Sequence, residues 1–100
     1  MHKRTRALAI SPPVKRRVAE RDGDYCIVCG RWGGLPNAHY IPRSQGGLGI
    51  EENIVTLCHE CHAAYDNSPM RRIIGQQIRE YLKSKYQNWD ESQLYYKKGI

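Results

Sequence analysis

Two Cys-x-x-Cys pairs contain all four cysteines of this 100-residue chain, and such pairs are typical of metal sites. Cys26 and Cys29 form the first pair, and Cys58 and Cys61 form the second. Zn²⁺ favours thiolate sulfur and binds four ligands in a tetrahedron, and the two pairs supply that number with no cysteine left over. The sequence therefore predicts one structural zinc site made of these four residues.

A second group of residues has the types needed for acid–base and metal chemistry. His39, Asn53 and His62 follow one another in the chain, and Asp66 comes four residues after His62. Histidine is the side chain whose pKa best suits proton transfer at neutral pH. Residues four apart in a helix share a face, so His62 and Asp66 are expected to lie side by side. Taken alone, His39 would more often be a strand histidine with a satisfied hydrogen bond, and Asn53 an ordinary turn residue.

Three stretches around these residues carry a family resemblance. They read AHYIPRSQGG over residues 38–47, ENIV over 52–55 and LCHECH over 57–62. In order and spacing they resemble the HNH endonuclease family, in the subtype whose core is held by two Cys-x-x-Cys pairs. The resemblance covers residues 24–66. It implies a small α+β fold, the ββα-metal (HNH, His-Me finger) core, stapled by a zinc site of four cysteines.

The resemblance also implies a role for each residue of the second group. His39 would be the general base that activates water for phosphodiester hydrolysis. Asn53 would hold the loop of the core and steer His39, or touch the metal as in some relatives. His62, and with it Asp66, would bind a single catalytic divalent ion. A carboxylate ligand favours Mg²⁺ or Mn²⁺, while a histidine ligand leaves Zn²⁺ and Ni²⁺ open.

One position departs from the family pattern. Many HNH enzymes carry a metal-binding Asp or His immediately before the base, but this chain has Ala38 there. Some relatives also read Ala-His, so the change need not abolish activity. It leaves few protein ligands, and water, phosphate oxygens or Asp66 are expected to complete the shell.

The net charge of +6 is concentrated near the N-terminus. Residues 1–21 hold seven basic residues against one acidic residue, whereas the remainder of the chain holds nine of each. A concentration of this kind is typical of a phosphate-binding segment, although it is also compatible with a solvated tail. The predicted DNA contacts are Lys15, Arg16, Arg17 and, beside the proposed base, Arg43.

The chain is expected to form one domain in three parts. Residues 1–23 would be a basic arm and helix, with Ser11 as N-cap and Gly23 near the end. Residues 24–67 would be the zinc-stapled core, with strands near 38–41 and 54–57 and a helix starting at Cys58. Residues 68–100 would be an amphipathic helix over 70–86 and an aromatic tail. The apolar residues of that helix recur at a helical period, at positions 70, 73, 74, 78, 81 and 82.

The leading hypothesis is a metal-dependent DNA endonuclease that nicks or cuts duplex DNA. The alternative is a non-catalytic zinc module that binds DNA or protein, for which Ala38 is the best support. An RNA-directed nuclease also fits the sequence, whereas the c-type haem pattern Cys58-x-x-Cys61-His62 is disfavoured by the second cysteine pair. Similarity to small phage nucleases encoded beside DNA-packaging genes implies a terminase partner.

The expected setting is the cytoplasm of a bacterial or phage-infected cell, without membrane association. The chain has no stretch near the roughly 18–20 apolar residues that a membrane span needs. The apolar run after the basic N-terminus, Ala7 to Ile10, is too short for the core of a signal peptide.

Overall fold

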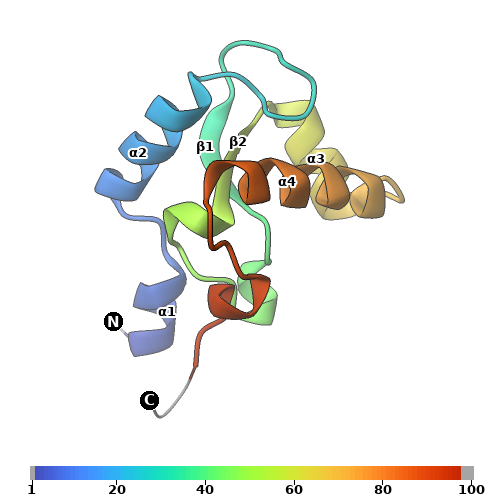
Figure 1. Cartoon of the computed structure of the whole chain (residues 1–100). Coiled ribbons are helices and arrows are strands. Elements are labelled where there is room, and N and C mark those ends of the chain that lie inside the picture. The colour runs from blue at the N-terminus through green and yellow to red at the C-terminus, as the bar shows by residue number, and fades with distance from the viewer. Residues whose placement is uncertain (1, 98–100) are drawn as a thin grey trace.

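A two-stranded antiparallel hairpin lies at the centre of the fold, with helices packed on both sides (Figure 1). The computed structural model describes residues 2–97, so Met1 of the predicted arm and residues 98–100 of the predicted tail lie outside the described residues. Strand β1 spans Leu35–His39 and strand β2 spans Ile54–Leu57. The helices are α1 (Lys3–Leu8), α2 (Pro12–Asp22), α3 (His59–Asn67) and α4 (Arg71–Lys85), and the short 3₁₀ turns are Arg43–Gln45, Glu51–Asn53 and Glu91–Leu94.

Helix α2 begins and ends where its sequence predicts. The Ser11 hydroxyl accepts a hydrogen bond from the Val14 N–H, which satisfies one of the free donors at the helix start. Gly23 ends the helix in the left-handed conformation, with φ of 65°, where a glycine carries no steric penalty. The N-terminal segment before it, predicted as a basic arm, contains the short helix α1.

The hairpin differs from the prediction in its first strand. Strand β1 ends at His39, not at Ile41, and begins at Leu35. The register shifts between the pairs Leu35↔Leu57 and Ala38↔Val55: β1 advances by three residues while β2 advances by two. This is a β-bulge, which adds one residue to β1 and changes where the side chains in between point.

Strand β2 is buried along its whole length because helices cover both of its faces. Ile54 packs with Val14 and Val18 of α2 in one apolar cluster. Val55 and Leu57 belong to the larger cluster, which includes Ile74, Ile78 and Leu82 of α4 together with Leu94. The hairpin is therefore fixed between α2 on one side and the α3–α4 pair on the other.

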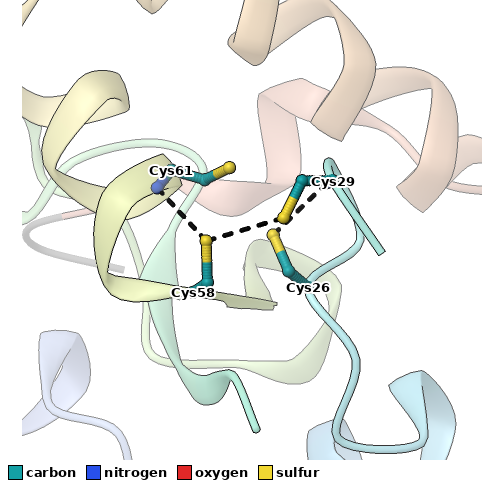
Figure 2. A group of neighbouring side chains, drawn as sticks. All are labelled: Cys26, Cys29, Cys58 and Cys61. Carbon is teal, nitrogen blue, oxygen red and sulfur yellow. Dashed lines mark hydrogen bonds between the residues drawn. The ribbon is translucent and has the colours of Figure 1, made fainter. Parts of the chain in front are cut away.

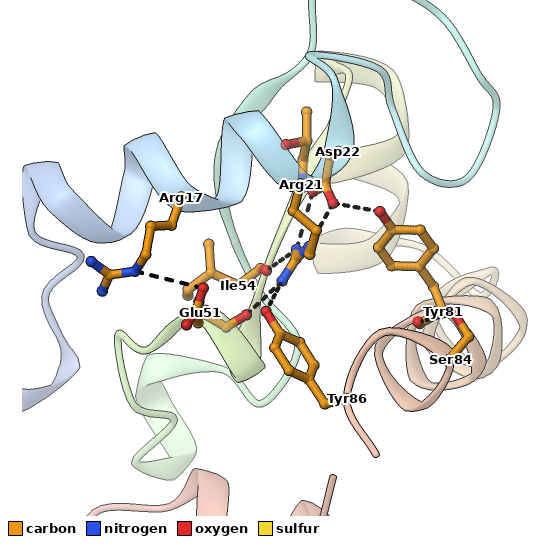
Figure 3. Close-up of polar contacts among 9 residues, drawn as sticks. Arg17, Arg21, Asp22, Glu51, Ile54, Tyr81, Ser84 and Tyr86 are labelled. Carbon is orange, nitrogen blue, oxygen red and sulfur yellow. Dashed lines mark hydrogen bonds and ion pairs between the residues drawn. The ribbon is translucent and has the colours of Figure 1, made fainter. Parts of the chain in front are cut away.

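A buried polar network joins the end of α2 to the C-terminal part of the chain (Figure 3). Arg21 donates to the carboxylate of Asp22, to the Ile54 carbonyl at 2.7 Å and to the hydroxyl of Tyr86 at 2.8 Å. Asp22 in turn accepts from the Tyr81 hydroxyl and from the Thr56 N–H. The hydroxyls of Tyr81 and Tyr86 therefore join α4 and its end to α2 and the hairpin. Removing one member of the buried Arg21–Asp22 ion pair would cost about 3–5 kcal/mol.

Helix α4 buries only part of its predicted apolar stripe. Ile74, Ile78 and Leu82 are buried, but Met70 and Ile73 are 48% and 54% exposed. Ile73 is exposed although the next residue, Ile74, is buried, so the two point to different sides of the helix, which corrects the predicted stripe. The aromatic segment that follows α4 folds back, with Leu94 buried and the Trp89 ring 5.9 Å from that of Tyr40.

The observed elements confirm the small α+β fold with a cluster of four cysteines. The β1–β2–α3 order is that of a ββα-metal core, with α2 and α4 as flanking helices. No helix within residues 2–97 has the length and apolar character needed to cross a membrane.

Candidate active site and metal centre

The four cysteines come together as a closed metal site. Their sulfur atoms all lie within 4.8 Å of one another, and the Cys29 and Cys58 sulfurs are 3.6 Å apart. Tetrahedral zinc with Zn–S bonds of about 2.3 Å places its sulfurs about 3.8 Å apart, so the spacing fits that ion. Figure 2 shows that Cys26 and Cys29 come from the loop after α2, while Cys58 and Cys61 come from the start of α3.

Backbone amides support the sulfurs in both pairs. The Cys29 N–H points to the Cys26 sulfur at 3.5 Å, and the Cys61 N–H points to the Cys58 sulfur at 3.4 Å. Burial alone would raise the pKa of Cys26, but backbone hydrogen bonds from residues including Cys29 outweigh burial and lower that pKa to about 7. Cys26 thus favours the thiolate that a metal requires, whereas burial and hydrogen bonds with the neighbouring cysteines raise the pKa of Cys61, so metal binding must displace its proton.

Helix α3 connects this cage to a second site. Cys58 is the N-cap of α3 and Cys61 lies in its first turn, whereas His62 and Asp66 project into a separate cavity. Consecutive helical residues differ by about 100° in direction, so Cys61 and His62 can serve two different sites.

The second site is a cavity of about 500 Å³ formed by α2, β1, α3, the segment after α1 and the loop after β1. It gathers polar side chains from residues far apart in the sequence. These are Lys15, Asn37, His39, Arg43, His62 and Asp66.

His39 is oriented by the N-terminal segment. Its Nε2 lies 2.9 Å from the backbone carbonyl oxygen of Leu8. A carbonyl only accepts, so Nε2 carries the proton, and in the neutral ring Nδ1 holds the free lone pair. Burial lowers the pKa of His39 below its usual value; the hydrogen bond to Leu8 opposes this, and the charge of Arg43 lowers the pKa further. The ring is therefore neutral, and able to accept a proton, near pH 7.

Close backbone contact holds the Leu8 carbonyl in place. The Gly49 N–H donates to the Ala7 carbonyl at 3.0 Å. A Cβ atom at Gly49 would lie 2.1 Å from the Ala9 carbonyl oxygen, so only glycine permits this approach. The end of α1 is thereby fixed against the loop that follows β1.

His62 and Asp66 form a pair on the face of α3 that lines the cavity. The His62 Nε2 lies 3.4 Å from an Asp66 carboxylate oxygen. Their side chains are 30% and 52% exposed, so both remain accessible from the cavity. An imidazole nitrogen and a carboxylate oxygen at this spacing are ligand types that can share a divalent ion.

Asn53 is completely buried and does not line the cavity. Its Oδ1 accepts from the Ile41 N–H at 2.8 Å, and its Nδ2 donates to the carbonyls of Ile41 and Leu48, at 3.2 and 2.8 Å. The Asn53 carbonyl also accepts from the Tyr40 N–H. Asn53 thus connects the end of the loop between β1 and β2 to the start of that loop, directly after His39. Its side-chain amide contacts backbone groups and does not face a metal position.

The predicted DNA-contacting residues lie in different places in the structure. Lys15 and Arg43 line the cavity beside His39. Arg16 is exposed elsewhere on α2, and Arg17 lies 3.6 Å from Glu51 in an ion pair. Arg21, which contributes to the N-terminal charge excess, is held in the buried network and is not available to DNA.

Two polar groups of the site were missed by sequence reasoning. One is the backbone carbonyl of Leu8, for which a sequence holds no signal. The other is Asn37, two residues before His39. Alternation along a strand places residues 37 and 39 on the same face, so that spacing could have indicated it. Ala38 points the other way and is completely buried in the core.

Comparisons with known proteins agree with this geometry. The family model described as HNH endonuclease matches residues 26–68. The chain is also 31% identical over 58 residues to Anaredoxin of Nostoc sp. (strain PCC 7120 / SAG 25.82 / UTEX 2576), an alignment that covers 57% of this chain and 76% of Anaredoxin.

A hairpin and helix that place a strand histidine opposite a helix histidine, stapled by four cysteines, define the zinc-hook class of ββα-metal proteins. This chain belongs to the HNH endonuclease family. Members of that family are generally nucleases that act on DNA.

Proposed function

We propose that this protein is a metal-dependent endonuclease that hydrolyses phosphodiester bonds of DNA. The observation that carries the proposal is a single cavity containing a neutral, carbonyl-oriented histidine, His39, together with the His62–Asp66 pair. Hydrolysis of a phosphodiester needs a base for water and a cation near the developing charge, and the two groups match these needs.

His39 acts as the general base. Its free Nδ1 takes a proton from the attacking water, and the ring is then a cation whose Nε2–H still donates to the Leu8 carbonyl. That hydrogen bond keeps the ring orientation constant through the proton transfer. Asn53 fixes the backbone directly after His39, and so acts as a positioning residue rather than a catalytic one.

His62 and Asp66 would hold the catalytic divalent ion. Such an ion, when bound, stabilises negative charge on the phosphate and on the leaving oxygen. The carboxylate of Asp66 favours Mg²⁺ or Mn²⁺, and the imidazole of His62 leaves Zn²⁺ and Ni²⁺ usable. Zn²⁺ itself is assigned to Cys26, Cys29, Cys58 and Cys61, where it has a structural role.

Lys15 and Arg43 are the groups best placed to hold the scissile strand. Both are cationic and both line the cavity that contains His39. Contacts of this kind neutralise phosphates without reading sequence. Arg16 and the partly neutralised Arg17 would add weaker contacts from α2. A phage DNA-packaging setting with a terminase partner stays a prediction of the family resemblance.

The competing function is a non-catalytic zinc module that binds DNA or protein. Ala38 favours it, because this buried residue supplies no ligand at the position that many HNH enzymes use. The two functions differ in one respect that can be measured directly: only the enzyme breaks phosphodiester bonds.

Plasmid nicking tests the proposal. Purified protein is incubated with supercoiled plasmid and Mg²⁺, Mn²⁺ or Ni²⁺, beside His39→Ala and a surface control, His59→Ala, which alters an exposed histidine of α3. We expect metal-dependent nicking by the wild type and by His59→Ala, and a rate about 10²–10⁴-fold lower for His39→Ala, the usual worth of a general base. Equal rates for wild type and His39→Ala would overturn the proposal in favour of the zinc module.

A further inference from the structure

Asn37 occupies an unusual place in the hairpin. It lies within the β-bulge between the Leu35↔Leu57 and Ala38↔Val55 pairs. Bulges are over-represented next to active sites. Here the side chain lines the cavity that also contains His39, His62 and Asp66.

The Asn37 amide oxygen has no partner within the described part of the chain. Its Oδ1 is buried and accepts no hydrogen bond. A buried amide oxygen left without a partner is destabilising, so such an atom calls for an explanation, for instance a ligand. The other unpaired side-chain atom among residues 2–97 is the Thr56 hydroxyl, which is buried in the core and does not line this cavity.

The proposed catalytic ion has few protein ligands. His62 and Asp66 supply two, and their 3.4 Å separation is close to the roughly 3.0 Å between neighbouring ligands of an octahedral ion with bonds near 2.1 Å. Ala38 supplies none, because its side chain is a methyl group buried in the core. An amide oxygen is a ligand type that Mg²⁺ and Mn²⁺ accept, and it adds no charge.

From these observations we infer that Asn37 Oδ1 is a third protein ligand of the catalytic divalent ion, in place of the ligand absent at Ala38. The inference rests on the proposed function, since it concerns the same ion. Asn37 approaches from strand β1 and the His62–Asp66 pair from helix α3, so the ion joins the two halves of the ββα core. Water and phosphate oxygens fill the remaining positions.

Mn²⁺ binding in the absence of DNA tests the inference without reference to activity. The free Mn²⁺ signal in electron paramagnetic resonance gives the Kd of zinc-loaded protein for Mn²⁺. Asn37→Ala is expected to weaken Mn²⁺ binding about 10-fold or more, the range seen when the support of a metal site is lost. Asn37→Asp should bind Mn²⁺ more tightly than the wild type, because a carboxylate replaces a neutral oxygen at the same position.

Two controls separate a ligand from a structural role. Asn88→Ala removes an exposed asparagine outside this cavity and should leave the Kd unchanged. Zinc content should be the same in all variants, and thermal stability in the absence of Mn²⁺ should not fall in any of them. A structural role for Asn37 in the bulge would weaken Mn²⁺ binding in both Asn37→Ala and Asn37→Asp, and that pattern would overturn the inference.

The nicking assay separates this inference from the proposed function. If the wild type nicks DNA and Asn37→Ala keeps a Kd within about two-fold of the wild type, well short of the loss expected for a ligand, Asn37 is not a ligand although the nuclease stands. If Mn²⁺ binding responds to Asn37 as expected but no plasmid is nicked, the ligand assignment stands and the nuclease proposal is wrong. Undetectable Mn²⁺ binding by the wild type overturns the ligand assignment.

Discussion

The cysteine cage and the cavity beside it share helix α3, yet they are built in opposite ways. The cage draws all its donors from two short local motifs, and its four sulfurs fill a tetrahedral shell completely. The cavity takes its groups from α2, β1, α3 and the segments around them, and His62 and Asp66 leave most of an ion's shell open. A complete shell stabilises a fold, while an open one leaves positions for water and substrate.

The cavity also depends on the cage for the position of helix α3. The cage fixes the start of α3 through Cys58 and Cys61, and the next residue, His62, enters the cavity. The position of the open site is therefore set by the closed one. Changes in the cage should affect the fold and, through it, divalent-ion binding and catalysis. Changes in the cavity should affect only divalent-ion binding and catalysis.

Loss of a cage ligand is expected to have the largest effect. A structural zinc ion contributes about 10–16 kcal/mol in small zinc domains, which equals or exceeds the roughly 5–15 kcal/mol that keeps a typical domain folded. Cys58→Ser should therefore unfold most of the protein, as measured by circular dichroism and zinc analysis. A well-folded Cys58→Ser protein, or less than about half a zinc per wild-type chain in unstripped protein, would contradict this.

Loss of a cavity ligand should leave the fold intact. His62→Ala is expected to weaken Mn²⁺ binding by at least about 10-fold, with excess Mn²⁺ partly restoring nicking. Asp66→Ala should have a smaller effect, because its carboxylate is more exposed than the His62 ring. His59→Ala, on the same helix but exposed, is the matched control, and zinc content should not change in any of the three. Equal Kd values for His62→Ala and His59→Ala would remove His62 from the metal site.

The basic residues should differ in their effect on DNA affinity. Each phosphate contact contributes about 0.9 to the slope of log affinity against log salt, so Lys15→Ala should lower the slope by about 1. Arg17→Ala should lower it less, because Glu51 already neutralises part of that charge. Lys83→Ala, an exposed lysine of α4, serves as the control. If Lys15→Ala and Lys83→Ala share one slope, then Lys15 does not contact DNA.

The smallest expected effect is a shift in the pH dependence of cleavage. His39 must be neutral to act as a base, and burial together with the charge of Arg43 lowers its pKa. Activity should therefore be retained until the pH falls through this lowered pKa. The acid limb of the pH–rate profile should lie below the usual range of histidine. Arg43→Gln removes one of the causes, so the acid limb at saturating DNA should move to higher pH.

Arg72→Gln, which removes an exposed arginine of α4, should leave the limb where it is. A shift to lower pH in Arg43→Gln would mean that Arg43 does not act on His39 through its charge.

Much of the scaffold was predictable because it depends on local signals. Ser11 and Gly23 cap α2 as their residue types suggest, since capping involves neighbours only a few residues away. The strand over residues 54–57 and the helix starting after Cys58 also follow the sequence. The predicted stripe of α4 failed at Met70 and Ile73 because burial depends on what lies opposite a helix face, which periodicity does not contain.

The sequence by itself determined the cysteine set, the HNH motif and the α+β class, since these depend on residue types and on short, fixed spacings. Only the tertiary structure decided which groups meet in the cavity. It brought the Leu8 carbonyl to His39, placed the Asn37 side chain in the cavity wall with its amide oxygen unpaired, and withdrew Arg21 into a buried network. These arrangements depend on close backbone approach and long-range packing, which arise only when distant segments are brought together.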